Sequence, residues 1–134
     1  MRICANNGGF LPEPRSEQEN NFLREFTNLA FWLGAIRISG NEYIWLSDGT
    51  KVVYTNWLTG SHPTTNDCIS SQYSLKAANW WSSPCTAHCD DLDCTIVCQR
   101  NVGKYSYYFY YIFVLIVKHF FLKEVVEKDF NTFS

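Results

Sequence analysis

Six cysteines constrain this chain more than any other feature, because all lie before residue 101 and five fall between Cys68 and Cys98. An even number of cysteines in about 100 residues predicts a framework of disulfides and an oxidising compartment. The alternative is a zinc site with ligands from the cysteine-rich end: Cys85, His88, Cys89, Cys94 and Cys98. Structural zinc sites usually separate two closely spaced ligand pairs by a longer stretch, so the spacing favours disulfides.

Three tryptophans, Trp32, Trp45 and Trp57, fall within 26 residues. Between them, residues 32–38 alternate as a strand does, residues 39–41 form a turn and residues 43–46 are extended again. Asp48-Gly49 then predicts a second tight turn, because Gly readily adopts positive φ. A loop cannot bury this much ring area, so we expect all three tryptophans on the inner faces of a small sheet.

Residues 16–29 carry the pattern of an amphipathic helix. Ser16 and Glu19 are spaced as a capping box, in which each side chain accepts a hydrogen bond from the backbone N–H of the other. Apolar side chains then recur on one face: Phe22, Leu23, Phe26 and Leu29. We expect this helix to pack on the sheet, with a short strand at residues 10–11 and further strands beginning near residues 68, 79 and 95.

Taken together, these motifs resemble the C-type lectin-like domain family. The resemblance is carried by four motifs: Trp32-Leu33-Gly34, Trp45 with Asp48-Gly49, Asn56-Trp57, and the cysteine-rich close at residues 94–99. It covers roughly residues 2–100 and implies a disulfide-braced α+β fold whose long loop region often binds calcium and sugar. We therefore assign residues 1–100 to one such domain.

The start of the chain departs from that family pattern. Such domains usually begin with a strand and a first helix upstream of the position matched by Cys4, and both are missing here. No apolar run precedes Cys4 that would serve as a secretory signal. We therefore expect an N-terminally incomplete domain, secreted or held on the extracellular face of a membrane.

The cysteine pairing is also implied by the resemblance. It pairs Cys4 with Cys98 and Cys68 with Cys85, which leaves Cys89 and Cys94 to close their own acidic loop. Because six cysteines permit about 15 pairings, only the family match selects this one. Cys94 in place of Cys85 as the partner of Cys68 stays open.

The family's calcium site is degenerate in this sequence. Sugar-binding members hold calcium with a proline-centred triplet in the long loop, a nearby acidic residue, and an Asn-Asp pair after a tryptophan. These positions read His62-Pro63-Thr64, Asn66-Asp67 and Trp81-Ser82, so only Asp67 brings a carboxylate. Calcium takes about six to eight oxygens, several of them carboxylates. We therefore expect no metal or other cofactor, and we interpret the acidic residues 90–93 as a solvated loop in which weak cation binding stays open.

Two function classes receive no support. Residues 1–100 hold 7 Lys and Arg against 10 Asp and Glu, so nucleic acid is not an expected partner. The three histidines are scattered, and neither a glycine-rich phosphate loop nor a paired-carboxylate site can be assigned. We therefore do not expect an enzyme.

The composition changes abruptly after residue 100. Residues 105–117 contain no charge, and Lys118-His119 separates them from a further apolar triplet that ends at Leu122. A membrane-spanning helix needs about 20 mainly apolar residues, whereas aromatic and β-branched residues equally favour an added strand. Residues 101–134 are therefore a membrane anchor through 105–122, a packed or aggregating extension, or a tail that is no natural part of the domain.

The sequence thus predicts an extracellular recognition module for a carbohydrate or protein ligand. Without calcium, a sugar would stack on Trp81 or Tyr73. The polar residues available to it lie in or beside the long loop: His62, Thr64, Asn66 and Asp67. A protein ligand would instead contact the loop of residues 58–67, and a membrane-tethered receptor ectodomain is the alternative. The oligomeric state stays open.

Overall fold

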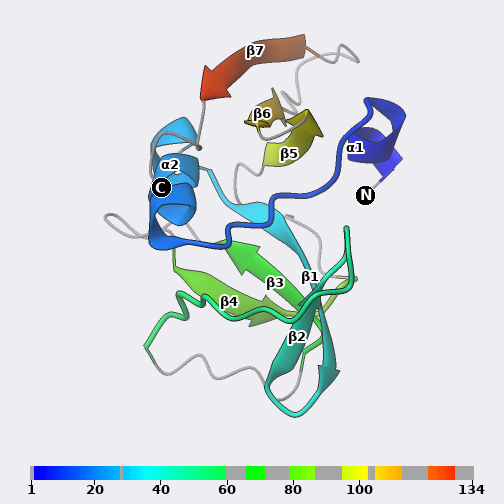
Figure 1. Ribbon diagram of the computed structural model, residues 1–134, viewed down its shortest axis with the longest axis vertical. Coiled ribbons are helices and arrows are strands. Elements are labelled where there is room, and N and C mark those ends of the chain that lie inside the picture. Colours follow the sequence, from blue (N-terminus) through cyan, green and yellow to red (C-terminus); the bar gives the residue numbers. More distant parts are fainter. Residues whose placement is uncertain are drawn as a thin grey trace.

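The computed structural model describes residues 2–27, 29–59, 66–71, 79–86, 95–102, 105–112 and 121–128. It has an α+β fold, as predicted, with two short helices and two antiparallel sheets (Figure 1). The helices are α1 (Arg2–Asn6) and α2 (Glu17–Phe26). The strands are β1 (Phe31–Ser39), β2 (Glu42–Trp45), β3 (Cys68–Ser71), β4 (Trp80–Ser83), β5 (Thr95–Val102), β6 (Tyr105–Ile112) and β7 (Phe121–Lys128).

The larger sheet has four strands in the order β2-β1-β3-β4. The hairpin β1–β2 confirms the predicted strand, turn and strand, with Gly40 at φ 47° in the turn. Gly49 likewise adopts φ 70°, as expected of the Asp-Gly turn. Phe31, Leu33 and Ala35 alternate along β1 and are buried, so this face of the sheet carries the core.

At the start of helix α2, one of the two hydrogen bonds of the predicted capping box is formed. The backbone N–H of Glu19 donates to the Ser16 hydroxyl at 3.2 Å. The Glu19 carboxylate accepts from the backbone N–H of Arg15, one residue before the predicted Ser16. Phe22 and Leu23 are buried, with Phe26 partly buried against the same core. The helix therefore adds its apolar side to the core.

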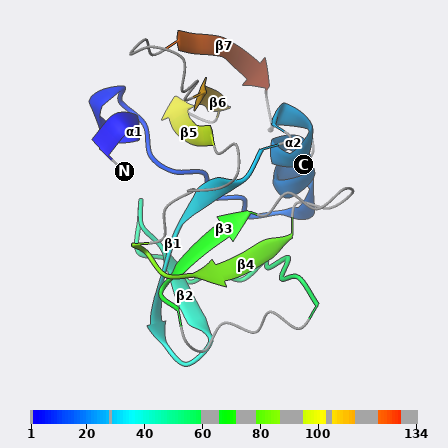
Figure 2. The same cartoon turned by 180° about the vertical axis from the view of Figure 1, so that it is seen from behind.

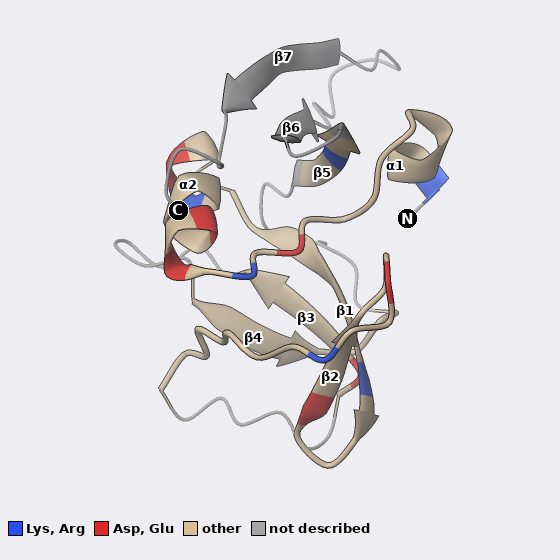
Figure 3. Ribbon diagram, in the orientation of Figure 1, with Lys and Arg blue, Asp and Glu red and all other residues tan. Residues whose placement is uncertain are grey.

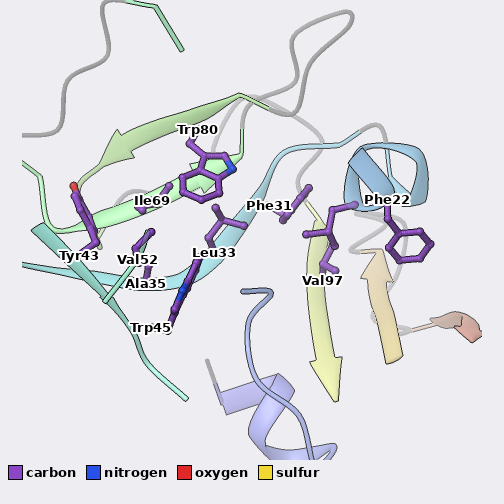
Figure 4. Close-up of a cluster of buried hydrophobic side chains, with 11 residues drawn as sticks. Phe22, Phe31, Leu33, Ala35, Tyr43, Trp45, Val52, Ile69, Trp80 and Val97 are labelled. Carbon is purple, nitrogen blue, oxygen red and sulfur yellow. The ribbon is translucent and has the colours of Figure 1, made fainter. Parts of the chain in front are cut away.

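The core is built largely from aromatic rings packed edge to face (Figure 4). The Trp80 ring lies 6.2 Å from the ring of Trp45 and 5.7 Å from that of Trp57 between centroids, close to perpendicular to both. The prediction for Trp32 was wrong, because Trp32 is half-buried and lies outside the core cluster. Phe31 and Leu33 take the inward positions of β1, which leaves Trp32 between them for the opposite face.

The smaller sheet has the order β5-β6-β7, and β5 pairs with β6 over eight consecutive residues. Phe10 pairs with Gln99 of β5, at the predicted entry of the N-terminal segment into the core. Residues 105–112 and 121–128 thus form added strands, while residues 113–120 lie outside the described part. In the described part of the chain, no helix is long and apolar enough to cross a membrane.

Two disulfides brace the described part of the fold. They join Cys4 to Cys98 and Cys68 to Cys85, the pairs that the resemblance implies. Among the described residues no cysteine is free, which leaves none of these four for a zinc site. Cys89 and Cys94 lie outside the described residues. The short helix α1 carries Cys4 itself.

Candidate functional site

The expected ligand positions meet where the chain enters β3. We call Asn66 and Asp67, the last two residues before Cys68, the loop end. The side-chain amide of Asn66 donates to the backbone carbonyl of Ser82 in β4 at 3.3 Å. The fold therefore brings the loop end beside Trp81-Ser82, the pair of residues that follows Trp80, as the family pattern requires.

The carboxylate of Asp67 is already bound by a cation of the protein. Arg37 in β1 donates to Asp67 Oδ1 from Nη2 at 2.9 Å and from Nε at 3.1 Å. The Arg37 side chain is 22% exposed and that of Asp67 is 59% exposed, so the ion pair lies at the surface with its positive partner largely covered. The backbone is joined as well, since the Arg37 N–H donates to the Asp67 carbonyl at 2.9 Å.

The backbone carbonyl of Asn66 is held from two strands. It accepts from the Tyr43 hydroxyl of β2 at 3.0 Å and from Arg37 Nε at 3.2 Å. Burial raises the pKa of the Tyr43 phenol, while the Ser82 side chain and the Arg37 charge act in the opposite direction. Because the net effect is a raised pKa, the phenol keeps its proton at neutral pH and stays a donor.

Trp81 and Ser82 face opposite sides of the sheet, because successive residues of a strand alternate. Ser82 is 6% exposed and lies on the inner side, where its side chain acts on the Tyr43 phenol. The Trp81 side chain is 39% exposed. The structure therefore does not group Trp81 with Asn66 and Asp67, although the sequence interpretation placed all three in one ligand site.

Trp81 belongs to the outer face of the sheet. Figure 2 shows the strands of this sheet from the side opposite to Figure 1. In the register, Ser70 of β3 lies between Trp32 of β1 and Trp81 of β4, so these three residues share that face. The hydroxyls of Ser70 and Ser83 lie 2.9 Å apart and hydrogen-bond to each other. Neither β3 nor β4 carries a charged residue (Figure 3), so the part of the outer face that these two strands form is neutral.

The fit to calcium is poor at every described position. Asp67 is paired with Arg37, Ser82 offers a buried hydroxyl, and Trp81 offers no oxygen side chain. Among the described residues, no group of three or more His, Cys, Asp or Glu side chains could hold a metal ion. His62, Thr64, Tyr73 and the acidic residues 90–93 lie outside the described part.

Two residues that contact the loop end, Arg37 and Tyr43, were not predicted from the sequence as part of the candidate site. Each residue lies within a predicted strand, and neither belongs to one of the family motifs quoted above. Their role follows from the register, which sets Arg37 opposite Tyr43 at the end of the β1–β2 hairpin. The only signal in the sequence is a polar residue at the end of a row of inward-facing residues in a strand. This signal does not show which residue the polar side chain contacts.

The fold defines a disulfide-braced α+β domain whose candidate site lies where the chain enters β3. The family model of the lectin C-type domain matches residues 1–100. The chain therefore belongs to the C-type lectin domain family. Domains of this family are generally non-enzymatic recognition modules for glycan or protein ligands, and they are typically extracellular.

Proposed function

We propose that this domain is an extracellular recognition module that binds a protein ligand without calcium. One observation carries the proposal: the Asp67 carboxylate at the loop end already accepts two hydrogen bonds from Arg37. A calcium ion would have to displace this guanidinium and would then find a single carboxylate among the described residues of the loop end. Calcium sites need about six to eight oxygens, several of them charged.

A protein ligand is favoured because the polar and aromatic groups of the candidate site are separated. The loop end uses its amide and carboxylate within the protein, and Trp81 lies on the other face of the sheet. A small sugar needs a ring and several free hydrogen-bonding groups close together, whereas a protein ligand can span both regions. Exposed tryptophans are frequent anchors of protein interfaces.

Carbohydrate binding is the second candidate function, and the exposure of Trp81 favours it. An indole on a neutral face can stack against the apolar side of a sugar ring, and the hydroxyls of Ser70 and Ser83 lie on neighbouring strands. Such binding would also be independent of calcium.

The test is binding by the oxidised full chain, with calcium and with chelator, to a glycan panel and to deglycosylated extracellular proteins. If the proposal is correct, the wild-type chain binds a protein equally well with calcium and with chelator. This binding falls in Trp81→Ala and persists in Val53→Ala. Val53 is the matched control because it is 86% exposed and lies outside the site. Glycan binding that ignores chelator and needs Trp81 would select the second candidate. Glycan binding abolished by chelator would contradict both.

A further inference from the structure

The guanidinium of Arg37 sits where the loop end, the β1–β2 turn and β1 itself converge. We infer that Arg37 is a positioning residue that acts as a built-in cation: it orders the loop end and makes a metal ion unnecessary there. This inference rests on the proposed calcium-independent function and names the residue responsible for it. Arg37 does not need to touch the ligand for this role.

The contacts of Arg37 support this role. Its side chain donates to oxygens from three residues: the carboxylate of Asp67 and the backbone carbonyls of Asn66 and Gly40. The first two belong to the loop end, and Gly40 belongs to the turn between β1 and β2. One side chain therefore ties the loop end to the hairpin.

The oxygens that surround the guanidinium are of the type that a hard divalent cation takes, namely carboxylate and backbone carbonyl. They are too few for calcium. A guanidinium has five N–H donors in a fixed plane, so it satisfies a small set of oxygens that calcium could not use. Its charge also opposes the approach of a second cation to Asp67.

The loop end is also held by hydrogen bonds to residues of β2 and β4 that do not involve Arg37. Tyr43 donates to the Asn66 carbonyl from β2, and Asn66 donates to Ser82 of β4. Cys68 follows immediately and is tied to Cys85. Because Arg37 supplies the only positive charge among these described contacts, its removal should loosen the loop end while the disulfide keeps β3 in place.

The experiment compares Arg37→Ala and Arg37→Lys with the wild-type chain in thermal unfolding, each with millimolar calcium and with chelator. Lys51→Ala is the matched control, because it breaks the exposed ion pair of Lys51 with Glu42 on the same sheet and leaves the loop end intact. We expect Tm of the wild type to be unchanged by calcium. Arg37→Ala should lower Tm by about 4 °C. Arg37→Lys should fall between them, because an ammonium keeps the charge but lacks the planar fork of donors.

A second readout separates positioning from general stability. In nuclear magnetic resonance spectra, Arg37→Ala should shift and broaden the Asn66 side-chain amide signals and leave the Trp80 indole N–H signal in place, since Trp80 bonds to Asn20 in the core. If Arg37→Ala does not fold, Asp67→Asn tests the same ion pair with a smaller change. Unchanged Asn66 signals in the folded variant, or a wild-type Tm that calcium raises by several degrees, would overturn the inference. No ligand is needed, so this result stands apart from the test of the proposed function.

Discussion

The indole N–H of Trp80 donates to the side-chain oxygen of Asn20 at 2.8 Å, and both residues are buried. This hydrogen bond joins α2 to β4 across the core, over a separation of 60 residues. Trp80 also packs edge to face against Trp45, Tyr54 and Trp57. The bond therefore fixes the orientation of the ring on which the aromatic core is assembled.

Replacing Asn20 by Ala should lower the free energy of unfolding by about 1–3 kcal/mol, because it leaves the buried indole N–H without an acceptor. Denaturant unfolding of the oxidised chain measures the loss. Asn21→Ala is the control, since Asn21 is exposed on the same helix. Equal stability of the two variants would show that the indole N–H finds another acceptor.

Gly34 allows the N-terminal segment to cross β1 at close range. A Cβ atom at this position would stand 2.7 Å from the Leu11 carbonyl oxygen and 3.1 Å from Cγ of Glu13. Glu13 is 2% exposed, and its carboxylate accepts from Arg15 and from both the backbone N–H and the hydroxyl of Ser47. The missing side chain of Gly34 thus makes room for a buried carboxylate and its partners.

Gly34→Ala should therefore cost about 1–3 kcal/mol of stability, as expected when a buried contact is overpacked and a backbone segment must shift. Gly40→Asn is the control, because a Cβ at Gly40 meets nothing within 4 Å and Asn tolerates the positive φ found there. Thermal unfolding of both variants measures the difference. A Gly34→Ala variant as stable as Gly40→Asn would mean that residues 11–13 can move aside freely.

Local rules of the sequence were sufficient for the hairpin and for helix α2. Ser16 caps the helix and Gly49 adopts positive φ because each depends only on neighbouring residues. The family resemblance supplied the pairing of Cys4 with Cys98 and of Cys68 with Cys85, which local rules cannot provide.

The sequence could not assign the faces of two strands. Phe31, Trp32 and Leu33 are all apolar, and Trp80 and Trp81 are adjacent, so alternation alone does not show which residue is buried. The contact of Arg37 with Asp67 was equally hidden, because it spans 30 residues and depends on the register of β1. The candidate site was thus located by resemblance, whereas its internal chemistry came from the fold.

Asp48 should contribute to stability in a way that depends on pH. Hydrogen bonds from the side chain and backbone of Thr50 lower the pKa of the Asp48 carboxyl, and Arg15 adds to this effect. A carboxyl whose pKa is lower in the folded state stabilises the protein above its unfolded pKa of about 4, and this contribution is lost as pH falls through the folded value.

Asp48→Asn should accordingly have a lower Tm than the wild type near neutral pH, and the gap should close as the pH falls below about 4. Glu25→Gln is the control, an exposed carboxyl on α2 outside the described ion pairs. Thermal unfolding across acidic and neutral pH tests this prediction. A gap between Asp48→Asn and the wild type that stays constant with pH would contradict it.

Strand β6 should behave in aqueous solution as part of the domain, because it pairs with β5 from Thr95↔Ile112 to Val102↔Tyr105. Amide protons in such a ladder exchange slowly with solvent. We expect hydrogen exchange of the intact, oxidised chain to be slow across residues 105–112 without detergent, as in β5, and fast at the turn of residues 40–41. Adding detergent micelles should change none of these rates. Fast exchange across 105–112 that becomes slow only in micelles would instead support the membrane anchor that the apolar composition of 105–122 left open.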